Sequence, residues 1–248
     1  MSETKPIIAT ANIITSSSYI SVDSNMLDSN TAKVLYDRNR DTKYSINFGS
    51  YKIITIDFQT SKTFDIIVLN NHNFKDFVIY YYDPFSSIWI QLGFAIGNTQ
   101  KDNFFKFKSP ITCRVVRIVV NALQSGSTLE IAEIWITKTW YEFERNFDTY
   151  NKQKFRKQDI YRLGMGEMKM WWIYEKYKAS IVCNYCSETM INSLKEIWDS
   201  PDAFTFIPEP DDMPSDIYLC HIINEFNAQY ISNWKGAGYT ITLEIEEV

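Results

Sequence analysis

Cysteine and histidine are scarce in this chain, and their scarcity disfavours several kinds of protein. The 248 residues hold only four cysteines, too few and too unevenly spaced for a secreted disulfide framework, so we expect reduced thiols. The two histidines, His72 and His221, leave little material for a catalytic triad, and no nucleophile motif lies near His72. We therefore predict that the protein is not an enzyme and assign no catalytic or cofactor-binding residue.

Long apolar segments and runs of basic residues are also missing. No stretch approaches the roughly 18 apolar residues that a membrane-spanning helix needs, and residues 1–6 lack the charged and then apolar pattern of a signal region. The net charge of −5 comes without clustered Lys and Arg, which phosphate contacts require. We expect synthesis in a cytoplasm, with neither a membrane nor nucleic acid as a partner.

The first half of the chain is rich in strand patterns. Ile54–Phe58 alternates apolar and polar residues, while Phe77–Tyr82 and Cys113–Val120 are largely apolar runs of strand length. Gln124–Ser127 is a turn-prone tetrapeptide. Residues 1–137 therefore predict an all-β domain, and a length of 248 residues leaves room for a second domain.

The pattern changes after residue 137. Residues 138–158 are polar, and we interpret them as a linker. From Met168 to Cys183 the chain reads as one or two strands, because four residues share one parity and are expected to point inward: Tyr177, Ala179, Ile181 and Cys183.

Residues 159–248 combine these strands with one helix. We expect the helix to start at Ser187 as N-cap and to end before Pro201, with an apolar stripe made by Met190, Ile191, Leu194, Ile197 and Trp198. The final strand places one set of residues on a single inward face: Tyr239, Ile241, Leu243 and Ile245. The second half therefore predicts an α+β domain.

Four segments of the first half carry a family resemblance. They are Asp37 to Thr42 followed by Tyr44, Ile54–Phe58, Arg114–Val120 and Glu133–Ile136. In this order and spacing they resemble the galactose-binding-like sandwiches of discoidin type. The resemblance implies a jelly-roll β-sandwich over residues 1–137 and a calcium ion in the early loop, with Asp37, Asp41, Thr42 and Glu133 as its ligands.

The loop itself allows two interpretations. Its alternate oxygen side chains suit calcium, but a helix–loop–helix calcium site is excluded because Thr42 replaces the required glycine and Phe48 the bidentate Glu. The interpretation we favour is a loop stabilised by its own Asp, Asn and Thr side chains without metal.

A second resemblance covers residues 159–248. The helix, then Phe204–Pro208, Tyr218–Cys220 and the terminal Tyr239–Glu247, resemble in their order the tail-tube-like domains of phage distal and minor tail proteins. The Asn71–Phe74 turn resembles a His-Asn motif of the galactose-binding-like domains in such proteins. These resemblances imply a virion component.

Cysteines and aromatic residues have competing interpretations. Cys183 and Cys186 have the spacing of a redox or zinc motif, but the parallel βαβ setting and further ligands are missing, so we interpret them as structural thiols. Aromatic residues make up 16% of the chain and could stack on sugars, yet most lie in strand-like runs. We therefore expect rings such as Trp89 to pack in the core.

Our leading hypothesis is a non-enzymatic structural component of a phage tail tip or baseplate. The C-terminal domain would assemble with other virion tail proteins and form a homo-oligomer, while the sandwich decorates or links. The alternative is a carbohydrate-binding adhesin whose sandwich loops contact host surface glycans.

Overall fold

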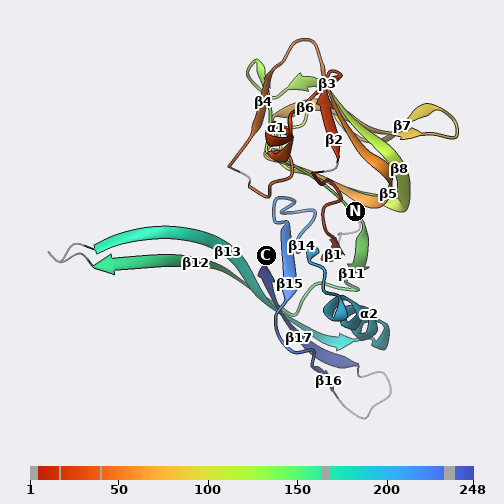
Figure 1. Cartoon of the computed structure of the whole chain (residues 1–248). Helices are drawn as coiled ribbons and strands as arrows, with labels where there is room; N and C mark the ends of the chain where they lie inside the picture. The colour runs from red at the N-terminus through yellow and green to blue at the C-terminus, as the bar shows by residue number, and fades with distance from the viewer. Residues whose placement is uncertain (1–4, 17, 40, 163–167, 232–237) are drawn as a thin grey trace. The chain divides into compact units, whose positions relative to one another are not determined.

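The computed structural model describes residues 5–16, 18–39, 41–162, 168–231 and 238–248 (Figure 1). It is mainly β with antiparallel strands, which confirms the predicted fold class. The chain forms two compact units. The first holds Ala9–Trp140 and Ile207–Ile217, and the second holds Lys5–Ile8, Tyr141–Phe206 and Tyr218–Val248.

The first unit is a β-sandwich. One sheet has the strand order β3-β2-β5-β8-β6-β7, with β10 also paired to β5, and β4 pairs with β9 in a second sheet. The strands are β2 (Tyr19–Val22), β3 (Asn25–Met26), β4 (Tyr44–Asn47), β5 (Lys52–Asn70), β6 (Phe74–Asp83), β7 (Ile88–Ala95), β8 (Asn103–Leu123), β9 (Thr128–Ile131) and β10 (Glu133–Thr137).

Strand alternation builds the core of this sandwich. Ile54 and Ile56 of β5 are fully buried and lie opposite Ile118 and Val116 of β8 in the antiparallel register. Their neighbours along each strand point to the other face, as the period of two requires. Each buried aliphatic side chain of this size contributes roughly 1.5–3 kcal/mol. The alternating sequence pattern therefore both forms and orients these strands.

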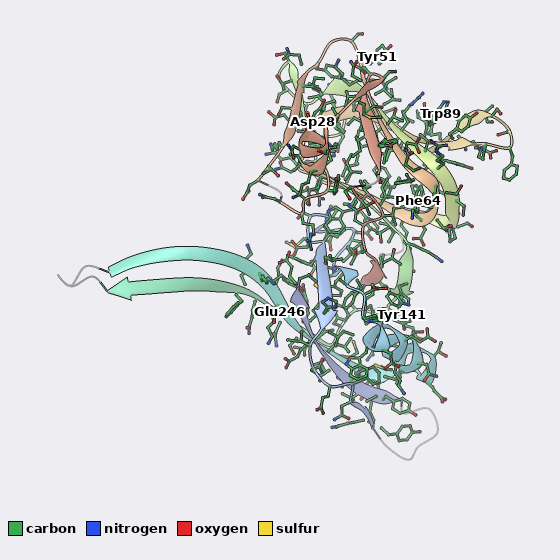
Figure 2. All side chains as sticks on the ribbon, in the orientation of Figure 1. Asp28, Tyr51, Phe64, Trp89, Tyr141 and Glu246 are labelled. Atoms are coloured by element: carbon green, nitrogen blue, oxygen red, sulfur yellow. The ribbon has the colours of Figure 1, made fainter. Side chains whose placement is uncertain are left out.

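A short helix, α1 (Ser29–Lys33), interrupts the first unit, where the sequence predicted only strands. The Asp28 carboxylate caps it by accepting hydrogen bonds from the Asn30 and Thr31 backbone N–H groups, each at 3.0 Å (Figure 2). Five residues are too few to show a helical apolar period, so the pattern could not reveal this helix.

The second unit is built on one sheet and one main helix, α2 (Glu188–Asp199). The strand order is β11-β1-β14-β15-β17-β13-β12, and β16 pairs with β17. The strands are β1 (Ile7–Thr10), β11 (Thr139–Glu142), β12 (Thr149–Arg162), β13 (Met168–Cys186), β14 (Phe204–Ile207), β15 (Tyr218–Ile222), β16 (Ala228–Tyr230) and β17 (Tyr239–Glu247).

The α2 boundaries agree with the sequence pattern, and on β17 the predicted Ile241, Leu243 and Ile245 are buried while Tyr239 is half-buried. Ser187 caps the helix by accepting a hydrogen bond from the Met190 N–H at 3.1 Å. The expected stripe is buried except for Trp198, which is 39% exposed because its indole N–H reaches out to the Asn224 carbonyl at 2.9 Å. Neither α1 nor α2, among the described residues, is long and apolar enough to cross a membrane.

Much of the segment expected as a linker, residues 138–158, is strand. It carries β11 and the first part of β12, where Thr149 lies opposite Val182 of β13. Residues 151–155 are exposed, so both faces of this part of the strand can be polar. A polar sequence of this kind is hard to distinguish from that of a loop. The strand predicted from Met168 falls partly on residues whose side chains lie outside the described ones.

Candidate ligand-binding site

A polar cavity of about 490 Å³ lies on the first unit, where the loops before β6, before β8 and before β9 meet. Every residue around it is polar, charged or glycine. The lining residues are Lys43, Asn71, His72, Asn73, Lys101, Gln124, Ser125, Gly126, Ser127, Thr128 and Glu130. This composition suits a ligand that offers many hydrogen-bonding groups.

His72 anchors the floor of the cavity through both ring nitrogens. Its Nδ1 accepts a hydrogen bond from the Phe74 backbone N–H at 3.0 Å, so the ring proton belongs on Nε2. Nε2 lies 2.8 Å from Asn103 Oδ1, to which it donates in that tautomer. Because neither nitrogen remains for a ligand, His72 positions the loop instead of contacting what binds there.

Burial keeps the His72 ring neutral. The side chain is almost fully enclosed, and its ring packs 4.5 Å from the Phe74 ring and 5.6 Å from the Phe77 ring, measured between centroids. Loss of hydration lowers the pKa of His72 to about 4, because an apolar setting disfavours the imidazolium. The ring therefore carries no charge at neutral pH.

Asn73 locks this loop to β9. Its Oδ1 accepts from the Glu130 backbone N–H at 2.9 Å, and its Nδ2 donates to the Thr128 carbonyl at 2.7 Å. The Gln124 N–H in turn donates to the Asn73 carbonyl at 2.8 Å. The walls are thus fixed before any ligand arrives, which lowers the entropy cost of binding.

Several polar groups around the cavity remain available. The Gln124 side-chain amide donates to the Gln100 and Phe74 carbonyls at 2.7 and 3.2 Å, which leaves its Oε1 without a partner among the described residues. The Ser125 and Ser127 hydroxyls and the Lys101 ammonium also make no hydrogen bond or ion pair with any described residue.

A salt bridge closes one side of the cavity. Lys43 Nζ lies 3.1 Å from Glu130 Oε2, and both side chains are about one-third exposed. Together with Lys101, this pair gives the cavity both signs of charge beside neutral amides and hydroxyls. The sequence pointed to Asn71–Phe74 by resemblance and to Gln124–Ser127 as a turn, with no binding role assigned to either. The other lining residues come from distant loops that the fold alone brings together, so no local motif could signal them.

The predicted calcium residues fall into two groups. Asp37 accepts from the Asn39 N–H at 2.8 Å and from the Thr42 hydroxyl at 2.9 Å, while the Asp41 N–H donates to Asn39 Oδ1 at 3.0 Å. The loop therefore ties itself together with its own side chains. Calcium binding there stays a prediction.

Glu133 lies on β10 and is buried. Its Oε2 accepts from the Trp135 indole N–H at 3.1 Å. The Ile134 N–H donates to the Leu35 carbonyl at 2.8 Å, which brings β10 beside the start of the Asp37 loop. Within the described ranges, no group of three His, Cys, Asp or Glu side chains is arranged to hold a metal ion.

Cys183 and Cys186 form a buried thiol pair just before α2. Cys186 Sγ donates to the Cys183 carbonyl at 3.3 Å. A hydrogen bond from the Cys183 thiol lowers the pKa of Cys186, and the same contact raises the pKa of Cys183. Cys220 is buried on β15, where burial raises its pKa. All four cysteines are free thiols, the form that was expected.

Trp89 does not pack in the core as expected. It lies on the outward face of the sheet, in register with Tyr82 of β6 and beneath the Arg117 guanidinium, which sits 3.8 Å from its ring centroid (Figure 2). Strand parity explains the difference, because Leu92 of β7 packs against the core and Ile90 lies opposite Tyr81 of β6, which also packs against it.

No family model matches the chain, and no curated protein does. Among solved structures, a family 32 carbohydrate-binding module from Streptococcus pneumoniae EndoD matches with 17% identity and a TM-score of 0.44, over 52% of this chain and 99% of that one. A family 32 module from Clostridium perfringens NanJ in complex with galactose gives 14% identity and a TM-score of 0.42, over 52% and 98%.

A fucosidase from Ruminococcus gnavus is also similar, with 17% identity and a TM-score of 0.43 over 52% of this chain. The present chain spans only 27% of that enzyme. At these identities and TM-scores, the matches carry no argument about function. No comparison supports the tail-tube resemblance of residues 159–248, which stays a prediction.

Proposed function

We propose that this protein is a non-enzymatic carbohydrate-binding protein whose first unit holds its ligand in the polar cavity. The observation that carries the proposal is a cavity of about 490 Å³ lined only by polar, charged and glycine residues. Sugars present many hydroxyl groups that both donate and accept hydrogen bonds. Ser125, Ser127 and Gln124 Oε1 offer matching partners at one wall, and Lys101 offers a donor at another.

The cavity suits weak and selective recognition. Its walls are braced by Asn73 and His72, so little entropy is lost when a ligand orders them. No Phe, Tyr or Trp ring of the described residues lines the cavity for stacking against a sugar face, so affinity rests on hydrogen bonds that each add about 0.5–1.5 kcal/mol net.

A glycan array probed with the full chain tests this proposal. Ser125→Trp places a large ring at an exposed position of the cavity wall and should abolish binding to every glycan that the wild type retains. Ser61→Trp is the matched control, since Ser61 is also exposed but does not line the cavity. Lys101→Ala should weaken binding about tenfold if it donates to the ligand, which corresponds to about 1.4 kcal/mol.

Two results would overturn the proposal. One is an array on which the folded wild type binds nothing. The other is equal binding by wild type and Ser125→Trp, because the ligand would then lie elsewhere. A loss of binding in Ser61→Trp as well would point to damaged folding, which circular dichroism on the same samples detects.

A structural role in a phage tail tip or baseplate is the second candidate, and one feature of the second unit favours it. β13 pairs with β17 only from Lys178 to Cys186, while Met168 to Tyr177 pair only with β12. Figure 1 shows this ribbon extending beyond the rest of its sheet. An isolated two-stranded ribbon is marginally stable in water, so a neighbouring subunit or tail protein would stabilise it.

Virion localisation can be tested separately from sugar binding. The full chain, labelled at its C-terminus, should decorate the tail end of purified particles in electron micrographs if it is a tail protein. Its absence from purified particles would remove this second role and leave the carbohydrate-binding proposal unaffected.

A further inference from the structure

A hollow of about 530 Å³ lies on the outer face of the first unit's large sheet, across the neighbouring strands β8, β6 and β7. Val78 of β6 faces outward there, because its neighbours Phe77 and Ile79 are fully buried in the core. Phe94 of β7 lies opposite Val78 in the antiparallel register, so its ring stands on the same outer face. A hollow of this volume suits a small-molecule ligand.

An exposed aromatic ring and three polar side chains line this hollow together. Phe94 is 56% exposed. The Gln91 and Asn121 amides are exposed and make no hydrogen bond with any described residue. Asp76 Oδ1 accepts from the Gly97 N–H at 2.7 Å, which leaves Oδ2 without a partner in the described chain. A sugar ring fits such a set, because its C–H face packs on an aromatic ring while its hydroxyls donate to carboxylates and accept from amides.

The hollow and the polar cavity are neighbours. Asn121 of β8 lines the hollow, and Gln124, three residues further on, lines the cavity. Likewise, Asp76 of β6 lines the hollow, and Asn73, three residues earlier, lines the cavity. Three residues of extended chain span at most about 11 Å between Cα atoms. A ligand made of a few linked sugar rings can therefore reach from one site to the other.

One loop borders both sites. Residues 96–101 run from Ile96, which lines the hollow, to Lys101, which lines the cavity. Asn98 fixes this loop, because its Nδ2 donates to the Phe74 carbonyl at 2.9 Å and its N–H donates to the Lys75 carbonyl at 2.9 Å. The spacing between the two sites is thus set before any ligand binds.

We propose that the hollow is a second subsite for the carbohydrate held in the cavity, so that the protein binds oligosaccharides in preference to single sugars. This inference rests on the proposed function and adds the aromatic contact that the cavity lacks. One sugar ring lies in the polar cavity. A ring further along the same glycan stacks on Phe94 and pairs its hydroxyls with Gln91, Asn121 and Asp76.

Mono-, di- and trisaccharides that share the same terminal sugar, titrated into the full chain by calorimetry, test this second subsite. Wild type should bind the longest glycan of a set about tenfold more tightly than the terminal sugar alone. Phe94→Ala should lose that tenfold gain and keep the wild-type affinity for the monosaccharide. Phe85→Ala is the matched control, because Phe85 is 98% exposed and lines neither site. It should bind every glycan as wild type does.

Two results would overturn the second subsite and leave the cavity in place: equal wild-type affinity for the short and long glycans, or unchanged affinity of Phe94→Ala for the long ones. Retained monosaccharide binding by Phe94→Ala shows that the variant is folded, and its loss would also contradict a separate subsite. Ser125→Trp distinguishes a failure of the cavity itself. If Ser125→Trp binds all glycans normally while Phe94→Ala binds none, the hollow is a site of its own, and both the cavity proposal and its extension are wrong.

Discussion

The two units of this chain use β-structure in opposite ways. In the first, the loops between paired strands are braced to each other by side chains such as Asn73 and His72, so a cavity exists before any ligand binds. In the second, one sheet carries a single main helix and a ribbon that outruns its neighbouring strand. The first unit therefore carries a braced polar cavity, and the second carries a projecting two-stranded ribbon.

The difference has a physical origin in where polar groups are satisfied. Around the cavity, amide side chains accept and donate to the backbone of other strands, which fixes the loops. In the β12–β13 ribbon, Met168–Tyr177 of β13 pair with β12 on one side. On the other side, their backbone groups pair with no third strand of the described chain. Breaking each arrangement should therefore affect the two units separately.

The largest expected effect comes from ending the chain at Gly238. This removes β17, which pairs with β13, β15 and β16, and whose Ile241, Leu243 and Ile245 are each 1% exposed. Their burial stabilises by roughly 4.5–9 kcal/mol together, comparable with the whole stability of a typical domain. Calorimetry should show the second unit's transition lost and the first unit's transition kept.

Deleting only Val248, which is 47% exposed, is the matched control and should leave both transitions in place. A chain truncated at Gly238 that melts like wild type would show that β17 does not hold the second unit together.

Protonation of His72 should have the next largest effect. Its pKa is about 4 in the folded chain and 6.5 when unfolded, so the unfolded state binds the proton more readily. The resulting stability is complete above pH 6.5, declines as the pH falls towards 4, and is lost below that value. The total is roughly 3 kcal/mol.

Denaturant melts of wild type and His72→Phe between pH 8 and pH 4 measure this difference. The carboxylates contribute equally to both chains and cancel. The variant should be less stable at pH 8, because Asn103 loses its donor, and should lose less stability on acidification. Parallel pH profiles would mean that His72 is not the titrating group.

The helix caps offer a smaller comparison between the units. Ser187→Ala removes the cap of α2 and should cost about 1 kcal/mol in the second unit's transition. Asp28→Ala removes the cap of α1 and should lower only the first unit's transition, by a similar amount. Calorimetry that resolves the melting transitions of the two units measures both effects. A variant that lowers the transition of the other unit would contradict the division into units.

The smallest effect is expected from chelation. The Asp37 loop is closed by the Asn39 N–H and the Thr42 hydroxyl, so it has stabilising contacts that involve no metal. We predict a melting temperature that changes by less than a degree or two between excess calcium and excess chelator. A calcium-dependent rise that Asp37→Ala or Glu133→Gln abolishes would instead establish calcium binding there.

The sequence predicted what depends on local pattern. Alternation located the strands that became β5 and β17, a largely apolar run located β8, and Ser187 marked the start of α2. Trp89 was wrongly placed in the core, because alternate residues of a strand point to opposite faces and the sequence did not show which face of β7 packs on the core. Residues 138–158, predicted as a linker, hold β11 and part of β12, and a strand exposed to solvent carries no apolar period that the sequence could show.

The cavity lay beyond sequence reasoning for a different reason. Lys43, Lys101 and Ser125 come from three loops and show no shared motif, and only the pairing of β4 with β9 and of β5 with β8 and β10 brings their loops together. His72 was noticed by resemblance, but its bracing role required the positions of Phe74 and Asn103.

The most direct test of the central claim is a titration of isotope-labelled full chain with the strongest glycan from the array, followed by amide chemical shifts. We expect shifts concentrated in residues 71–73, 101 and 124–130, including the Gln124 side-chain amide. Shifts confined to β7, to the second unit or to no region at all would contradict a carbohydrate site in the polar cavity.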